Sequence, residues 1–255
     1  MDLSIIIVNY NVKEFIQNLL ESIKSASKKI SAEVIIVDNA SDDGSIELIR
    51  QKYPWVKLIV NSRNLGFSKA NNLGLREATG KYLLLLNPDT LVKEDTFEKM
   101  ISFFEATPDA GMAGCKLLNT DGTLQLACRR GFPGPWASFT KVTGLSALFP
   151  KSPLFARYNL TYLDENKTYA VDAISGAFMM FTREVYEKTG GLDETFFMYG
   201  EDLDLCYRVN KAGYKVYYVH STEIIHYKGE STKRSNLNEV KVFYEAMHIF
   251  VKKYY

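Results

Sequence analysis

The sequence predicts a single α/β domain, spanning residues 1–255, with a mostly parallel central sheet and helices on both faces. Short apolar segments of strand length alternate with segments whose apolar residues recur at helical spacing, and a polar loop follows each strand. The 255 residues, 46% of them hydrophobic, are enough to build one sizeable core. The formal net charge of +1 argues against a globally basic surface for nucleic acid.

The first half of the chain is predicted to repeat a strand, a polar loop and a helix. The predicted strands are 3–8, 33–37 and 56–60, and the helices that follow them are 12–23, 45–53 and 68–78. Residues 82–86 form a fourth strand, which is apolar throughout and therefore predicted to be buried on both faces. The polar loops should open on one edge of the sheet, where ligands of open α/β sheets bind.

The second half is predicted to be less regular. A helix at 93–105, a strand at 112–117 and a hairpin-like turn at 119–122 come first. Residues 129–169 are rich in glycine, proline and aromatic residues and predict a long lid-like loop with short helices. The remaining predicted elements are a strand-like segment at 171–182, helices at 183–188 and 201–209, a strand at 215–220, a polar loop at 226–231 and an amphipathic helix at 238–255.

Cysteine usage and hydropathy suggest a compartment. Cys115, Cys128 and Cys206 are odd in number and form no C-x-x-C pair, so neither a disulfide framework nor a zinc site is predicted. The N-terminus lacks the pattern of a signal peptide, and no apolar run reaches the roughly 18 residues of a spanning helix. We expect a cytoplasmic protein, with any membrane contact peripheral and on the inner face of the cell membrane.

The step from residue 87 to 89 is the first candidate site. Asn87 and Asp89 lie two residues apart at the end of the buried strand, so both side chains leave it on the same side if the chain stays extended. No G-x-G-x-x-G or Walker A motif is present to hold phosphates. A divalent cation on Asp89 is the natural substitute, and His226 is a candidate further ligand. The alternative for a lone histidine is a structural role.

The loops after the first three strands form a second candidate site. Together they offer an aromatic ring, amides, a carboxylate and a guanidinium, which could stack on a pyrimidine base and bind a ribose. These residues are Asn9, Tyr10, Asn11, Asp38, Asn39 and Arg63. The alternative is that the Asn and Asp residues only terminate strands and cap helices.

Glu201 and Asp202 form the third candidate site, at the start of a predicted helix. Acids in a first helical turn can serve only as partners of the helix dipole. A carboxylate near an acceptor hydroxyl, however, is what a displacement at a sugar carbon needs, because the hydroxyl is a poor nucleophile until a base takes its proton.

The order and spacing of these motifs resemble a family 2 glycosyltransferase with the GT-A fold. The resemblance covers nearly the whole chain, and it implies a nucleotide-binding half, 1–118, and an acceptor-binding half, 119–255, which includes the lid-like loop 129–169. It rests on residues 4–11, 36–42, 63–67, 87–89, 200–202 and His226.

The resemblance implies roles for the donor-binding residues. Tyr10 would stack on the nucleotide base and Asp38 would contact the base or ribose. The metal motif of the family is Asp-x-Asp, and this chain has Asn87-Pro88-Asp89. Of the two positions of this motif, only Asp89 would therefore bind Mg²⁺ or Mn²⁺. Asn87 would instead contact the ribose or a phosphate. His226 resembles the late histidine that completes the metal and diphosphate site.

The resemblance also implies roles on the acceptor side. Asp202 would be the catalytic base, and Glu201 would contact the acceptor or support the helix. Residues Ser175, Gly176 and Ala177 resemble the segment that lines the sugar pocket, and Lys228 is assigned to sugar or acceptor binding with them.

The implied activity is inverting transfer of a sugar from a nucleoside-diphosphate sugar to a glycan or polyprenyl-linked acceptor. Residues 64–89 look most like bacterial rhamnosyltransferases of cell-surface polysaccharide assembly, which implies dTDP-L-rhamnose as donor. The aromatic segment 136–155 and the C-terminal helix either touch the membrane surface or merely close the core.

Two other functions are alternatives for this sequence. The first is a non-catalytic protein with the same fold that binds sugar nucleotides or acts as a scaffold. The absence of the first acid of the metal motif, at Asn87, favours this alternative. A nucleotidylyltransferase would need a Gly-rich phosphate loop after its first strand, which residues 9–11 do not provide.

Overall fold

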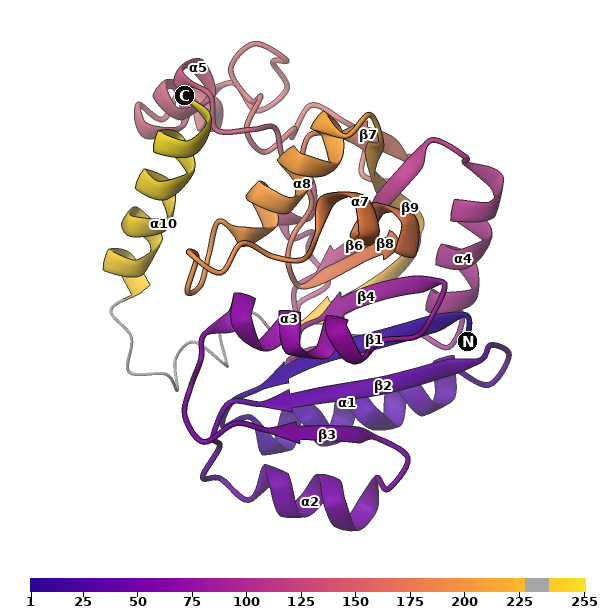
Figure 1. Ribbon diagram of the computed structural model, residues 1–255. Coiled ribbons are helices and arrows are strands. Elements are labelled where there is room, and N and C mark those ends of the chain that lie inside the picture. Colours follow the sequence, from indigo (N-terminus) through magenta and orange to yellow (C-terminus); the bar gives the residue numbers. More distant parts are fainter. Residues whose placement is uncertain (228–238) are drawn as a thin grey trace.

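The computed structural model describes residues 1–227 and 239–255, which form a nine-stranded sheet covered by helices (Figure 1). The strand order is β3-β2-β1-β4-β8-β6-β9-β5, and β7 also pairs with β9. The strands are β1 Leu3–Asn9, β2 Ala32–Asp38, β3 Lys57–Val60, β4 Tyr82–Leu86, β5 Thr90–Val92, β6 Ala110–Leu118, β7 Tyr169–Val171, β8 Phe178–Thr182 and β9 Lys215–His226.

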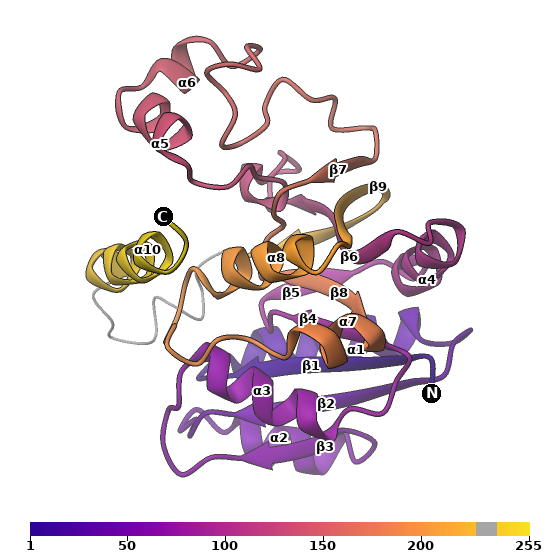
Figure 2. The same cartoon turned by 45° about the horizontal axis from the view of Figure 1, so that its top comes forward.

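The helices connect these strands as the alternating pattern predicts. They are α1 Lys13–Ala26, α2 Ser45–Lys52, α3 Phe67–Glu77, α4 Thr96–Ala106, α5 Pro135–Val142, α6 Leu145–Leu148, α7 Arg183–Thr189, α8 Glu201–Lys211 and α10 Glu239–Tyr254, with a 3₁₀ turn at Leu126–Cys128. Right-handed crossovers put α1 and α2 on one face of the sheet and α3 on the other (Figures 1 and 2). The prediction of helices on both faces is confirmed.

Most of the strands run in one direction. Strands β1, β2, β3 and β4 pair in parallel, and β6 pairs in parallel with β9. Strand β8 is antiparallel between β4 and β6, and β5 and β7 are antiparallel to β9. Because β1 and β4 are buried along their whole length, their sequences are continuous apolar runs instead of alternating ones.

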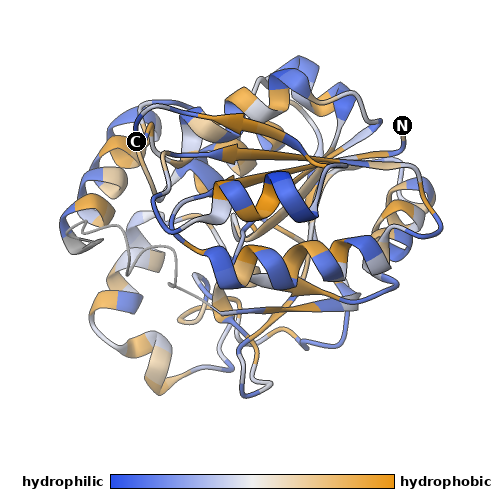
Figure 3. Cartoon of the chain, turned by 90° about the horizontal axis from the view of Figure 1, so that it is seen from below, coloured by the Kyte–Doolittle hydropathy of each residue, from blue (hydrophilic) through white to orange (hydrophobic). Residues whose placement is uncertain are grey.

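The packing of α3 on the sheet depends on a glycine. A Cβ added at Gly74 would lie 2.5 Å from Cγ2 of Ile6 in β1, so only glycine allows the helix this close to the strand. Figure 3 shows that the strands of the sheet are mainly hydrophobic, whereas the helices also carry hydrophilic residues. The N-terminal end of α3 is thereby held beside the carboxyl ends of β1 and β2.

Three local expectations are wrong. His226 is the last residue of β9 and not part of a loop, because β9 runs for 12 residues and pairs with both β6 and β5. Strand β5 was not predicted, and α4 consequently begins at Thr96. Ser175, Gly176 and Ala177 lie between β7 and β8 and not inside a strand. The strand pairings that decide these points are not visible in local periodicity.

The segment 129–169 is mostly irregular, with α5 and α6 inside it, as predicted. These two helices stand apart from the sheet, close to the C-terminal end of α10 (Figures 1 and 2). Among the helices that the structure describes, none is long and apolar enough to cross a membrane. The predicted loop residues 228–231, including Lys228, lie outside the described residues.

Candidate active site

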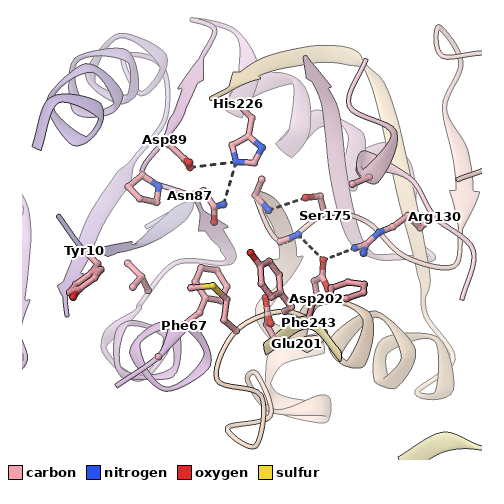
Figure 4. A pocket seen from close by; sticks show the side chains of 18 of the residues that line it. Tyr10, Phe67, Asn87, Asp89, Arg130, Ser175, Glu201, Asp202, His226 and Phe243 are labelled. Carbon is pink, nitrogen blue, oxygen red and sulfur yellow. Dashed lines mark hydrogen bonds and ion pairs between the residues drawn. The ribbon is translucent and has the colours of Figure 1, made fainter. Parts of the chain in front are cut away.

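A cavity of about 730 Å³ opens at the carboxyl ends of β1, β2 and β4, where the topology predicts a ligand site (Figure 4). It collects ten of the predicted site residues from segments far apart in the sequence. These are Tyr10, Asn39, Asn87, Asp89, Ser175, Gly176, Ala177, Glu201, Asp202 and His226. The cavity is large enough for a ligand of drug size or above.

Asp89 and His226 face each other in one corner of the cavity, which we call the acidic corner together with Asn87 (Figure 4). Nε2 of His226 lies 3.4 Å from Oδ1 of Asp89 and 3.5 Å from Nδ2 of Asn87. Oδ1 of Asp89 and Oδ1 of Asn87 are buried and find no hydrogen-bond partner among the described residues. Buried polar atoms are normally paired, so these two oxygens are suited to bind a ligand.

Gln125 fixes the orientation of His226, and sequence reasoning missed it. Nδ1 of His226 donates to Oε1 of Gln125 at 2.8 Å, and Nε2 of Gln125 donates to the backbone oxygen of His226 at 2.7 Å. The Nδ1 proton leaves the Nε2 lone pair directed at the acidic corner. An outer partner of this kind is usual for a histidine that binds a metal.

The acidic corner therefore fits a divalent cation. Carboxylate, amide and imidazole acceptors suit Mg²⁺ or Mn²⁺, and the orphaned oxygens would gain a partner. Within residues 1–227 and 239–255, no group of three or more His, Cys, Asp or Glu side chains gathers as a metal site. The remaining ligands would have to come from Asn87, from water or from a bound diphosphate.

Asn9 and Asp38 are placed behind the cavity wall. Both are fully buried, and Nδ2 of Asn9 donates to Oδ2 of Asp38 at 2.7 Å. Asp38 also accepts from the backbone N–H and the hydroxyl of Ser41. In this conformation the two residues tie the first loop to the second.

The other residues of the predicted nucleotide site divide into two groups. Tyr10 and Asn39 line the cavity, and Oδ1 of Asn39 accepts from Asn61 at 2.9 Å. Asn11 and Arg63 do not line it. Asn11 has a φ of 54° and accepts from the backbone N–H of Asp42, while Arg63 is exposed.

Asp202 lies across the cavity from the acidic corner, at the start of α8 (Figure 4). Nη2 of Arg130 donates to Oδ2 of Asp202 at 2.5 Å, and the backbone N–H of Gly176 donates to the same oxygen at 3.2 Å. Arg130 is itself buried and also donates to the backbone oxygen of Ile174. The carboxylate is thus held in one orientation, with its charge balanced by a buried guanidinium.

Glu201 has a raised pKa. Burial, together with the adjacent charge of Asp202, raises the pKa of Glu201 to about 8. Its Oε2 is buried without a hydrogen-bond partner among the described residues. At neutral pH Glu201 is therefore mainly protonated.

Replacing Glu201 with glutamine is expected to stabilise the protein more at pH 8 than at pH 5. The unfolded chain ionises Glu201 near its usual pKa of 4.5, whereas the folded protein keeps the proton up to about pH 8. The wild-type protein therefore loses stability as the pH rises through this window, by about 1.4 kcal/mol for each unit by which the pKa of Glu201 is raised. Thermal denaturation at both pH values measures the difference.

The matched control for this measurement is Glu187→Gln, which removes an exposed acid on α7. It should shift the melting temperature little, and equally at both pH values. An equal shift for Glu201→Gln at pH 5 and pH 8 would show that the carboxyl is ionised in the folded protein.

Aromatic residues form the remaining wall of the cavity. Tyr158 comes from the segment 129–169, Tyr199 precedes α8, and Phe243 and Tyr244 come from α10. The rings of Tyr199 and Phe243 are 6.2 Å apart and nearly perpendicular. Such rings suit the apolar face of a sugar.

Helix α10 is anchored to α8, which carries Asp202. Nζ of Lys253 donates to Oδ1 of the fully buried Asp204 at 2.6 Å, and the hydroxyl of Tyr254 donates to the same oxygen at 2.5 Å. Arg208 pairs with the other oxygen of Asp204 at 2.8 Å. The aromatic wall and the candidate base are therefore parts of one packed unit.

Two protein-family models match the chain. The model of the family described as glycosyl transferase family 2 matches residues 4–190. A second family model, the N-terminal domain of galactosyltransferase, matches residues 160–230, which include α8.

Two curated relatives cover nearly the same length. The N-acetylglucosaminyl-diphospho-decaprenol L-rhamnosyltransferase of Mycobacterium tuberculosis is 27% identical, over 98% of this chain and 83% of that protein. The rhamnosyltransferase WbbL of Escherichia coli K12 is 29% identical, over 88% of this chain and 82% of that protein.

Solved structures share the fold. The mannosyltransferase PcManGT of Pyrobaculum calidifontis, solved with GDP-Man and Mn²⁺, matches with a TM-score of 0.61 and 20% identity, over 88% of this chain and 56% of that one. TarS of S. aureus, residues 1–349, matches with a TM-score of 0.62 and 15% identity, over 95% of this chain and 68% of that one.

Proposed function

The chain belongs to glycosyltransferase family 2 and has the GT-A fold, and on that premise we propose that it transfers a sugar, with inversion, from a nucleoside-diphosphate sugar to a glycan or lipid-linked glycan. One observation carries the proposal. The acidic corner and Asp202 lie on opposite sides of a single cavity, with Tyr10 at its margin (Figure 4). A donor can lie across the cavity with its diphosphate at the corner and its sugar toward Asp202.

The donor half, 1–118, holds the nucleotide. Tyr10 stacks on the base, and Asn39 faces the ribose from the end of β2. Asn9 and Asp38 shape the loops that carry these groups, and the carboxylate of Asp38 binds the base or ribose if the loop opens. Arg63 and Asn11 contribute from the exposed rim.

The acidic corner would hold Mg²⁺ or Mn²⁺ next to the diphosphate. Asp89 and His226 would supply an oxygen and a nitrogen ligand, and Asn87 would supply an amide oxygen or bind phosphate directly. A bound cation would neutralise negative charge on the leaving diphosphate. Gln125 keeps the Nε2 lone pair of His226 directed at that position.

The acceptor half, 119–255, carries the base. Asp202 takes the proton of the acceptor hydroxyl, whose oxygen attacks the anomeric carbon as the bond to the diphosphate oxygen breaks. Arg130 and the N–H of Gly176 hold the carboxylate in place, and Ser175 and Ala177 line the same side of the cavity. Glu201 supports the helix start or contacts the acceptor. Lys228, which lies outside the described residues, stays a prediction for sugar or acceptor binding.

The donor is proposed to be dTDP-L-rhamnose and the acceptor a polyprenyl-linked sugar, acted on at the cytoplasmic face of the cell membrane. The names of the two curated relatives support the sugar, and the name of the Mycobacterium tuberculosis relative supports a decaprenyl-linked acceptor.

A thermal-shift panel of UDP-, GDP- and dTDP-sugars, each with Mg²⁺, Mn²⁺ or a chelator, tests the donor. The largest rise in melting temperature is expected for dTDP-L-rhamnose with a cation, and a panel without any shift would refute the proposal. Release of nucleoside diphosphate in the presence of membrane lipids then separates an enzyme from a non-catalytic binding protein, which would bind the donor without turnover.

A further inference from the structure

Large apolar side chains cluster on the surface between α5 and residue 154. Val142 is 88% exposed and Leu148 is 70% exposed. We call this cluster the lid patch; it consists of Trp136, Phe139, Val142, Leu148, Phe149 and Leu154, all exposed. Soluble monomers rarely leave so many large apolar groups together on one surface, so the lid patch points to an interaction.

The lid patch is ordered by contacts among its own rings. The rings of Trp136 and Phe139 are 5.7 Å apart, and those of Phe149 and Phe155 are 5.3 Å apart. The ring centroids of Trp136 and Phe155 are 6.2 Å apart, so this contact connects the two pairs. The indole N–H of Trp136 donates to the backbone oxygen of Leu154. The apolar surface is therefore formed before any partner arrives.

The segment that carries the lid patch has charged side chains of one sign. No Asp or Glu occurs between Asp121 and Asp164. The same segment carries the exposed basic residues Lys141, Lys151 and Arg157. Apolar rings surrounded by cations suit a surface with an anionic rim and an apolar interior, which describes a bilayer with acidic lipids.

The lid patch adjoins the acceptor side of the cavity. Lys141, Tyr158 and Asn159, from the same segment, line the cavity, and Lys141 lies over the ring of Tyr158 at 3.9 Å. Exposed rings are also present at Tyr244 in α10 and at Tyr255, directly after the end of that helix. A surface that bound the lid patch would lie next to the cavity mouth.

We propose that the lid patch docks the protein on the anionic surface of a lipid bilayer, with the acceptor side of the cavity turned toward the lipid. The purpose of docking rests on the proposed function, since a polyprenyl-linked acceptor is reached only there. A second copy of the chain is a poorer occupant, because two lid patches face to face would oppose the basic residues of both copies.

The two tryptophans of the chain allow a direct test. Trp136 lies in the lid patch, and Trp55 lies between α2 and β3, in the other half of the chain. Trp55→Phe leaves Trp136 as the sole reporter, and Trp136→Phe leaves Trp55. On adding phosphatidylglycerol vesicles, the emission of the Trp55→Phe variant should shift to shorter wavelength, while that of the Trp136→Phe variant should not. No shift from Trp136, or a shift from Trp55 alone, would overturn the proposal.

Cosedimentation with the same vesicles gives a matched pair of variants. Val142→Glu combined with Leu148→Glu should weaken vesicle binding at least about tenfold. Val60→Glu introduces the same acid at an exposed valine of β3 and should leave binding unchanged. Uncharged phosphatidylcholine vesicles, or high salt, should weaken binding of the wild-type protein.

The outcomes separate the docking proposal from the proposed function. Donor binding is measured without vesicles. A protein that bound no donor would therefore contradict the proposed function and leave the docking proposal unaffected. Vesicle binding by the double variant at the wild-type level would overturn docking through the lid patch. So would a wild-type dimer in light scattering that the double variant converts to a monomer, because a second copy would then occupy the patch.

Discussion

Asp202→Asn is expected to lower sugar transfer by about two to four orders of magnitude while leaving donor binding nearly unchanged. The amide has the shape of the carboxylate but cannot take the proton of the acceptor hydroxyl. Asp202 lies on the far side of the cavity from the acidic corner, so the nucleotide and diphosphate contacts remain (Figure 4). The measurements are kcat for transfer and the calorimetric affinity for the donor.

The control must account for Arg130. This buried guanidinium loses its charged partner in Asp202→Asn, although the amide oxygen can still accept its hydrogen bond. Asp204→Asn, two residues further along α8, also removes a buried carboxylate that pairs with cations, and should lower the melting temperature with a much smaller loss of kcat. Transfer by Asp202→Asn at the wild-type rate would eliminate Asp202 as the base.

Asp89→Ala is expected to abolish the cation-dependent part of nucleoside-diphosphate binding. Asp89 is the one carboxylate of the acidic corner. Its Oδ1 has no hydrogen-bond partner among the described residues, and Nε2 of His226 lies 3.4 Å from it. Calorimetry with dTDP, with and without Mn²⁺, should show a strong cation effect for the wild-type protein and none for the variant. An unchanged affinity in the presence of Mn²⁺ would contradict the metal role.

Gln125→Leu provides a graded comparison for the same measurement. The variant keeps Asp89 and His226 but removes the acceptor that fixes the Nδ1 proton of His226. Loss of such an outer partner usually costs about 10- to 100-fold in metal affinity, so the variant should fall between the wild-type protein and Asp89→Ala. Mn²⁺ affinity equal to that of the wild-type protein would assign Gln125 a purely structural role.

The sheet could be predicted from the sequence because its central strands are buried on both faces. Such strands are mainly apolar, and the apolar residues of the helices between them recur at helical spacing. Strands β1, β2 and β4, and the sheet edge where they end, could therefore be predicted. The antiparallel strand β5 could not, because three residues are too few to show an alternation of apolar and polar side chains. The extension of β9 to His226 depends on pairing with β5 and β6, which lie far away in the sequence.

The candidate site was predictable only where a motif marks it. Asp89, Asp202 and His226 follow a recognisable order, and the structure brings them into one cavity. Arg130 and Gln125 act through partners 72 and 101 residues away, so nothing near them in the sequence identifies them. A hydrogen-bonding partner of a functional residue can be found only when the fold is known.

The most direct test of the account is a crystal structure of the protein grown with dTDP and Mn²⁺, with diffraction data collected to reveal manganese by its anomalous signal. We expect a manganese peak between Asp89 and His226, with the diphosphate of dTDP beside it and the thymine base stacked on the ring of Tyr10. A manganese peak outside the acidic corner, or a nucleotide bound outside this cavity, would contradict it.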